Sequence, residues 1–203
     1  MFKEEIHPGV LHAGIDEVGR GCIAGPVVAA AIIIPAEKLN AIAVADSKKC
    51  TPKQREQLAK ELLRDATAWG VGVIGVNTID TINILQATLV AMQAAVERCW
   101  IKPRHVWVDG RDTPKLDMPA TAVIGGDNSV ELIAAAGIIA KVYRDNLMCM
   151  YAMQYPQYHF AKHKGYGTKQ HLEALSLHGA CTIHRKSFAP VSKVINQVAT
   201  ESV

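Results

Sequence analysis

The sequence predicts a single α/β domain built on a mixed five-stranded sheet that is flanked by helices. Two apolar runs, Val10–Ile15 and Val27–Ile34, are separated by a short glycine-rich segment, which indicates a first hairpin. Further apolar runs alternate with helix-like segments in the rest of the chain. A fully parallel sheet would need a helix after its first strand, but the Gly25-Pro26 step leads directly into the second apolar run. We therefore expect both strand directions in one sheet.

The later elements follow from local signals. Three more strands are expected at Val71–Val76, His105–Val108 and Ala120–Ile124. Helices are expected from Thr51 to Gly70, Ile82 to Trp100, Val130 to Met153, Thr168 to Gly179, and after Pro190. The first of these has the strongest start signal, because Thr51, Pro52 and Gln54 form a capping box with proline at the first helical position. Asp80 or Thr81 is expected to cap the next helix.

Composition limits the possible classes of protein. The chain has 203 residues, of which 49% are hydrophobic and 20% charged, and its net charge of +3 is only weakly basic. No repeat or linker is seen, so residues 1–203 are expected to form one domain. Five scattered cysteines without a Cys-x-x-Cys pair favour a reducing cytoplasm and oppose a structural zinc site. The longest apolar stretch, Cys22–Ala36, contains glycine and prolines and is too short to span a bilayer.

Carboxylates follow three of the predicted strands. Asp16 and Glu17 follow the first strand, Asp109 follows the fourth and Asp127 follows the fifth, and each group has glycine nearby. Each one alone could be an ordinary turn residue. Together they would repel one another unless divalent cations neutralise them, and a set of oxygen ligands favours Mg²⁺ or Mn²⁺. Two such ions about 4 Å apart can hold a phosphodiester, activate water and stabilise the leaving oxygen.

The geometry of the first acidic pair requires a bend. Neighbouring strand residues point to opposite faces, so Asp16 and Glu17 can share an ion only where the strand ends. Gly19 and Gly21, on either side of Arg20, allow such a turn and leave backbone amides accessible to a ligand. The alternative is a hairpin with a solvated acidic tip.

Asp145 competes with Asp127 for the fourth position in the acidic set. It lies 18 residues later on the predicted long helix, which corresponds to about 27 Å of helix rise. The two residues cannot share an ion on a straight helix. Asp127 is therefore the expected ligand, and Asp145 is expected to pair on the surface with Arg144 or a neighbouring basic group.

Basic and aromatic residues gather late in the chain. The predicted loop Tyr155–Thr168 contains His163-Lys164-Gly165-Tyr166-Gly167, in which glycines expose the tyrosine. Basic side chains can position phosphates, and aromatic rings can pack on sugars or bases. The other interpretation is a solvated face with a few packing aromatics.

These segments together resemble bacterial ribonuclease HII across nearly the full chain. The matching segments are Gly14-Ile15-Asp16-Glu17-Val18-Gly19-Arg20-Gly21, Asp46-Ser47-Lys48-Lys49, Asn83-Ile84-Leu85, Val108-Asp109-Gly110, Gly126-Asp127, Ile139-Ala140-Lys141-Val142-Tyr143-Arg144-Asp145, His163-Lys164-Gly165-Tyr166-Gly167-Thr168, and His184-Arg185 with Ser187-Phe188. The resemblance implies a ribonuclease H-like fold with a small C-terminal helical extension. It also implies endonucleolytic cleavage of the RNA strand of RNA–DNA hybrids, and cleavage 5′ of single ribonucleotides embedded in duplex DNA, leaving 5′-phosphate and 3′-hydroxyl ends.

The resemblance also assigns roles to residues. It implies that two divalent ions, Mg²⁺ or Mn²⁺, are held by the catalytic carboxylates Asp16, Glu17, Asp109 and Asp127. It implies that the segment Gly19, Arg20, Gly21 contacts the ribose 2′-hydroxyl, which distinguishes RNA from DNA, and that Tyr166 packs on the deoxyribose beyond the RNA–DNA junction. Phosphate contacts are expected from Lys48, Lys164 and Arg185.

The chain departs from the family pattern at three positions. Cys22 stands where proline is frequent, Gly137 where serine is common, and Asn128 where a smaller residue is usual. None is a proposed ligand. We expect a cytoplasmic monomer that acts on RNA–DNA hybrids and ribonucleotide-containing duplex DNA and does not bind membranes. The competing hypotheses are a DNA-strand transferase or resolvase of the same superfamily, and a catalytically silent hybrid-binding module.

Overall fold

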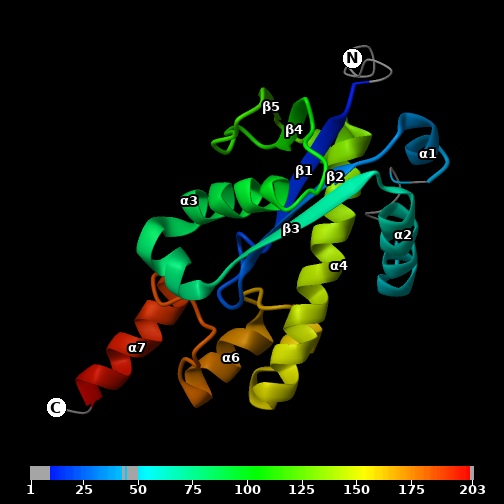
Figure 1. Ribbon diagram of the computed structural model, residues 1–203. Coiled ribbons are helices and arrows are strands. Elements are labelled where there is room, and N and C mark those ends of the chain that lie inside the picture. The colour runs from blue at the N-terminus through cyan, green and yellow to red at the C-terminus, as the bar shows by residue number, and fades with distance from the viewer. Residues whose placement is uncertain (1–9, 43, 45–49, 202–203) are drawn as a thin grey trace.

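The computed structural model describes residues 10–42, 44 and 50–201, with side chains up to residue 197 (Figure 1). Its five-stranded sheet has the order β3-β2-β1-β4-β5. The strands are β1 (His12–Val18), β2 (Val27–Ile33), β3 (Ala68–Ile74), β4 (His105–Asp109) and β5 (Ala120–Val123). Strands β1, β2 and β3 pair antiparallel, whereas β4 pairs parallel with β1 and β5. The predicted mixed sheet that begins with a hairpin is confirmed.

Helices cover the sheet on both faces. They are α1 (Ala36–Asn40), α2 (Pro52–Asp65), α3 (Val76–Glu97), α4 (Glu131–Gln154), α5 (Phe160–His163), α6 (Lys169–His178) and α7 (Ala189–Glu201), with 3-10 turns η3 (Gly126–Asn128) and η4 (Pro156–Tyr158). Every residue of β2 is buried. Its side chains alternate between two cores, with Val27 and Ala29 packing with α3 and Val28 and Ala30 packing with α4. This explains why β2 is a continuous apolar run.

Two of the three predicted helix caps are confirmed. The capping box of α2 is present, with the Thr51 hydroxyl accepting from the Gln54 amide and the Gln54 side chain accepting from the Thr51 amide. Thr168 caps α6 by accepting from the His171 amide. Helix α7 begins one residue before Pro190, which occupies its first turn. These signals act within four residues, so the rest of the fold does not alter them.

Two predicted helix boundaries are wrong. Gly70 does not end α2, which stops at Asp65; it lies inside β3, where a side chain would come within 2.1 Å of the Ala95 carbonyl of α3. Glycine at this position allows α3 to approach the sheet closely. Neither Asp80 nor Thr81 caps the following helix. The helix is kinked at Asn83, at a φ of 65°, and the Asn83 side chain caps the second segment by accepting from the Gln86 amide.

Helix α3 is also the one described helix that is long and apolar enough to cross a membrane by length and composition. Its kink at Asn83 and its packing against β2 and β3 are those of a core helix. Length and composition alone are weak evidence for a membrane span, because core helices meet the same criterion.

The chain after α4 forms the expected C-terminal helical extension, which lies beside the β1–β2 connection (Figure 1). The predicted loop Tyr155–Thr168 contains η4 and α5. Isolated bridges pair Cys22 with Tyr166 and Ala24 with His184. The extension is thus joined by backbone hydrogen bonds to the segment that follows the acidic pair.

Candidate active site

The acidic pair lies inside β1, at the end of the sheet where its neighbour β4 stops. Strand β1 continues past Asp16 and Glu17 to Val18, which pairs with Val28 of β2, whereas the sequence predicted that the strand ends at the pair. Pairing with β4 ends at Ile15 and Val108, so one edge of β1 is open beside the acidic residues. Asp109 is the last residue of β4 and lies at that open edge. Ligand oxygens of Asp16, Glu17 and Asp109 lie within 4.8 Å of one another.

The surroundings of Asp16 strongly disfavour its ionised form. Burial, followed by the charges of Glu17, Asp109 and Asp127, raises the pKa of Asp16 well above its ordinary value. Its Oδ1 accepts a hydrogen bond of 2.7 Å from the Glu17 amide, which favours the ionised form but does not offset the burial. A bound cation would therefore lower the electrostatic free energy of the ionised Asp16 carboxylate.

Glu17 has an unsatisfied oxygen directed into the structure. Its Oε2 is buried and has no hydrogen-bond partner among the described residues, while its Oε1 is 3.3 Å from Nη1 of Arg20. Burial raises the pKa of Glu17, and Arg20 opposes this shift. The Asp109 Oδ1 accepts from the Gly126 amide at 2.8 Å, which fixes its orientation. Buried polar atoms normally have a partner, and a divalent metal ion, which binds preferentially to oxygen atoms, could be the partner of this one. The three carboxylates therefore fit a site for such an ion.

Asp127 lies near this group but outside it. It belongs to η3, a turn after β5, so the expected position at a strand end is only approximate. Its charge contributes to the raised pKa of Asp16, and it lines the same cavity. One of its oxygens accepts from the Asn128 side chain at 2.8 Å. The structure therefore brings Asp127 to the site without including it in the group of three.

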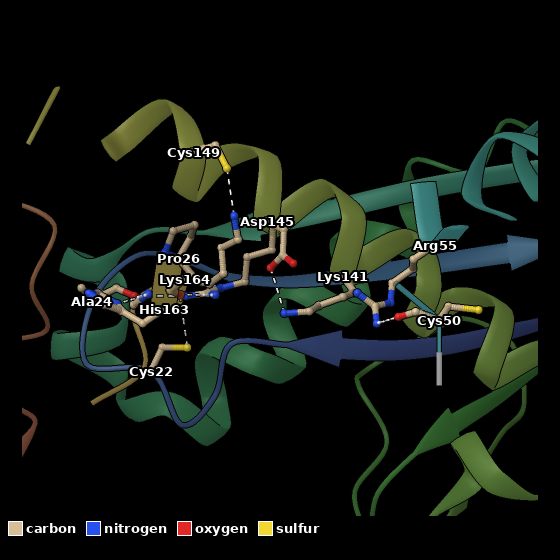
Figure 2. A network of polar contacts seen from close by, with 12 residues as sticks. Cys22, Ala24, Pro26, Cys50, Arg55, Lys141, Asp145, Cys149, His163 and Lys164 are labelled. Atoms are coloured by element: carbon tan, nitrogen blue, oxygen red, sulfur yellow. Dashed lines mark hydrogen bonds and ion pairs between the residues drawn. The ribbon is translucent and has the colours of Figure 1, made fainter. Parts of the chain in front are cut away.

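A cavity of about 440 Å³ opens over the acidic residues. Asp16, Glu17 and Asp127 line it together with Tyr166, which the sequence singled out, and with Arg55 and Lys141, which it did not. Nη2 of Arg55 donates to the Cys50 carbonyl at 2.9 Å (Figure 2). Lys141 follows Gly137 by one helical turn, and Gly137 faces Asp16, so helical spacing is the signal that could have placed Lys141 here.

Lys141 is also the ion-pair partner of Asp145. The Lys141 ammonium is 2.9 Å from Oδ1 of Asp145 (Figure 2). It is also 5.9 Å from the centre of the Tyr166 ring. The expectation that Asp145 pairs with a neighbouring basic group is confirmed. The partner is Lys141 and not Arg144, which is fully buried and donates to backbone carbonyls.

The turn after β1 exposes two of its three residues. Gly19 is buried with a φ of 97°, whereas Arg20 and Gly21 are exposed. A side chain on Gly19 would collide with the Arg144 guanidinium, and one on Gly21 would meet no atom within 4 Å. The open space is on the Gly21 side, where a ligand can approach the backbone.

The three expected phosphate contacts have different outcomes. Arg185 is fully buried, and its guanidinium donates to the carbonyls of Gly19, Arg20 and Gly25. A direct phosphate contact is incompatible with this position, so that prediction is wrong. Lys164 is half-buried, with its ammonium 2.9 Å from Sγ of Cys149 (Figure 2), and a phosphate contact from it stays a prediction. Lys48 lies outside the described residues.

Comparisons with known proteins agree with this geometry. The sequence model of ribonuclease HII matches residues 13–191. A ribonuclease HII of Polaromonas sp. is 52% identical over 93% of this chain and 94% of its own length, and one of Idiomarina loihiensis is 50% identical over 90% and 97%. The crystal structure of ribonuclease H2 from Pyrococcus horikoshii covers 94% of this chain and 99% of its own, at a TM-score of 0.80 and 27% identity.

More distant structures share the fold. A ribonuclease HIII crystallised with Mn²⁺ covers 94% of this chain and 71% of its own, at a TM-score of 0.76 and 16% identity. The ribonuclease H-like architecture expected from the motifs is thus confirmed by solved structures as well as by the sheet order. Taken with the match of the family over most of the sequence, these findings show that the chain belongs to the ribonuclease HII family and is a ribonuclease H, an endonuclease of RNA–DNA hybrids.

Proposed function

We propose that this ribonuclease H cleaves 5′ of single ribonucleotides embedded in duplex DNA, as well as within hybrids, and that it does so with two divalent metal ions. The observation that carries the proposal is the convergence of ligand oxygens of Asp16, Glu17 and Asp109 within 4.8 Å, with one buried oxygen of Glu17 that has no partner among the described residues. Such a group is electrostatically unfavourable by itself and becomes favourable when a cation is bound.

Each carboxylate has a distinct position for this role. Asp16 and Asp109 approach from adjacent strands, and Glu17 follows Asp16 on β1 with a carboxylate oxygen within 4.8 Å of theirs. Asp127 reaches the cavity from η3 as the fourth carboxylate. Bound Mg²⁺ or Mn²⁺ would supply charge stabilisation for the phosphodiester and lower the pKa of an attacking water. The products would carry 5′-phosphate and 3′-hydroxyl ends.

Substrate selection is proposed to reside in the turn and the extension. The exposed turn residues Arg20 and Gly21, with Gly19 behind them, would contact the ribose 2′-hydroxyl. Tyr166 lines the acidic cavity and is 40% exposed, so its ring is available to pack on a sugar. Lys164 would contact a phosphate, and Lys48 is proposed for the same role on the basis of the motif alone. We further propose that the protein is a monomer and that it works in the cytoplasm. The cytoplasmic location is consistent with five free cysteines.

The test is digestion of three labelled duplexes that differ only in one strand. One contains a single ribonucleotide, one contains an RNA segment and one is all DNA. With Mg²⁺, we expect a single cut 5′ of the lone ribonucleotide, multiple cuts in the RNA segment and none in the all-DNA duplex. Cleavage of the all-DNA duplex would favour the strand-transferase or resolvase alternative, and an uncut single-ribonucleotide duplex would refute the proposed specificity.

The conservative variant Asp16→Asn separates catalysis from binding. It keeps the shape of the side chain and removes the charge, so cleavage should fall by at least about 1,000-fold while binding of the ribonucleotide-containing duplex remains measurable. Full activity of Asp16→Asn would contradict the assigned metal site.

A further inference from the structure

Two buried arginines lie beneath the turn that follows the acidic pair. Arg144, from α4, and Arg185, from the segment between α6 and α7, are both fully buried. Among the described residues, neither forms an ion pair with a carboxylate. Burying a guanidinium without a counterion is costly unless every donor is satisfied. The presence of two such side chains therefore indicates a structural or functional role that offsets the free-energy cost of burying them.

All of their observed hydrogen bonds go to backbone carbonyls. Arg144 donates to Pro26 at 2.9 Å, Lys164 at 2.8 Å and Ala24 at 3.1 Å. Figure 2 shows these three acceptors lying together beside α4. Arg185 donates to Gly25 at 3.0 Å, Arg20 at 2.9 Å and Gly19 at 2.7 Å. Both guanidinium groups bond to the later part of the connection, at Ala24, Gly25 and Pro26. Among the described residues, only Arg185 also bonds to the carbonyls of Gly19 and Arg20 in its first part.

The bonds from Arg185 determine which way two amides point. In a trans peptide, the C=O and N–H groups point in opposite directions, and the described chain has no cis peptide. When the carbonyls of Gly19 and Arg20 point inward to Arg185, the amides of Arg20 and Gly21 point outward. In the part of the chain that the structure describes, neither amide donates to another backbone group. Both belong to exposed residues, and the space beside Gly21 is open.

We propose that Arg185 is a positioning residue for ribonucleotide recognition, which presents the Arg20 and Gly21 amides to the substrate by holding the carbonyls of Gly19 and Arg20. This inference rests on the proposed function of the turn. Burial lowers the pKa of Arg185 to about 10, so the guanidinium remains charged at neutral pH and its field favours an anionic phosphodiester next to the turn. Arg185 acts through the backbone and does not touch the substrate.

Arg144 provides a matched control. It is equally buried and also donates to three carbonyls. Its guanidinium packs against Gly19, but its acceptors in the connection, Ala24 and Pro26, lie beyond the two amides, so it does not hold the carbonyls of Gly19 and Arg20. Substitution by lysine keeps the charge and removes the planar fork of donors. Arg185→Lys and Arg144→Lys should therefore destabilise the protein similarly and differ in substrate recognition.

The kinetic experiment compares both variants on the duplex with one ribonucleotide. We expect Arg185→Lys to raise KM for this duplex at least about tenfold more than Arg144→Lys does, at similar losses of Tm. Equal KM changes in the two variants would overturn the positioning role. If wild-type protein does not distinguish this duplex from all-DNA duplex, the proposed function is refuted. If wild type distinguishes them but the two variants change KM equally, only the positioning role of Arg185 is refuted.

A measurement on the wild-type protein covers the case in which Arg185→Lys does not fold. Amide NMR signals of Arg20 and Gly21 should exchange rapidly with solvent in the free protein. In EDTA, which prevents metal-dependent cleavage, they should shift on addition of the duplex with one ribonucleotide and shift less with all-DNA duplex. Protected amides in the free protein, or equal shifts with both duplexes, would contradict the inference.

Discussion

Gly137 of α4 lies directly against the carboxylate of Asp16. A side chain on Gly137 would begin 2.3 Å from Oδ2 of Asp16, closer than non-bonded atoms approach. The Asp16 carboxylate would have to rotate away from Glu17 and Asp109 to make room. A position on the outer helix thus controls the orientation of a candidate metal ligand on the central strand.

The first prediction concerns Gly137→Val. The branched side chain should displace Asp16 and raise the Mg²⁺ concentration needed for half-maximal cleavage by at least about tenfold, since ligand geometry determines affinity for a small cation. Magnesium titration of hybrid cleavage measures this. Gly137→Ser is the matched comparison, because serine has the same Cβ but its hydroxyl can donate to the displaced carboxylate and hold it near the site. Unchanged Mg²⁺ affinity in Gly137→Val would contradict the steric explanation.

The second prediction is that the variant Asp16→Asn is more stable than wild type without metal. Burial and neighbouring charges raise the pKa of Asp16, so its ionised form opposes folding at neutral pH. Asparagine removes that charge, and the free energy of unfolding in EDTA should rise by about 1 kcal/mol or more, because one pKa unit corresponds to about 1.4 kcal/mol. Added Mg²⁺ should raise the Tm of wild type and much less that of the variant. A less stable variant in EDTA would show that the charge is already compensated.

The third prediction follows from a chain of buried histidines in the C-terminal extension. The Cys181 amide donates to Nδ1 of His184, so Nε2 of His184 carries the proton and donates to Nε2 of His171 at 3.1 Å. Nδ1 of His171 then donates to the Tyr166 carbonyl at 2.8 Å. Each ring is neutral in this arrangement. Burial lowers the pKa of both His171 and His184 to about 4.

Stability should therefore fall on acidification between pH 6.5 and pH 4. In this window the unfolded chain, whose histidines have a pKa near 6.5, binds protons that the folded state excludes. The raised pKa values of Asp16 and Glu17 act in the opposite direction, so the test compares wild type with His171→Gln. Urea unfolding from pH 7 to pH 4.5 should show a smaller loss of stability in the variant, by about 1–2 kcal/mol. Parallel pH profiles would refute the contribution of His171.

Local chemistry explains what the sequence could predict. The caps at Thr51 and Thr168, the hairpin and three of the four residues in the predicted acidic set depend on neighbouring residues or on strand ends, and the structure contains them. The kink at Asn83 was not predictable, because a positive φ at asparagine is favourable only through the packing of the whole helix. Arg185 was assigned wrongly because a charge usually implies exposure, whereas a guanidinium can be buried when each of its three nitrogens donates to a backbone carbonyl.

The fourth prediction concerns Asp80, which does not cap a helix but fastens the C-terminal extension to α3. Its carboxylate accepts from the Lys186 amide at 2.9 Å, from the Ser187 amide at 2.9 Å and from the Ser187 hydroxyl at 2.5 Å. Asp80→Ala should lower the free energy of unfolding by about 1–2 kcal/mol, since hydrogen bonds to a charged acceptor are exchanged for bonds to water at an exposed site. Ser187→Ala, which removes only the hydroxyl bond, should cost about 1 kcal/mol or less. Hydrogen exchange of the Lys186 and Ser187 amides should accelerate in Asp80→Ala and change little in Ser187→Ala; unchanged exchange in Asp80→Ala would show that other contacts hold this segment.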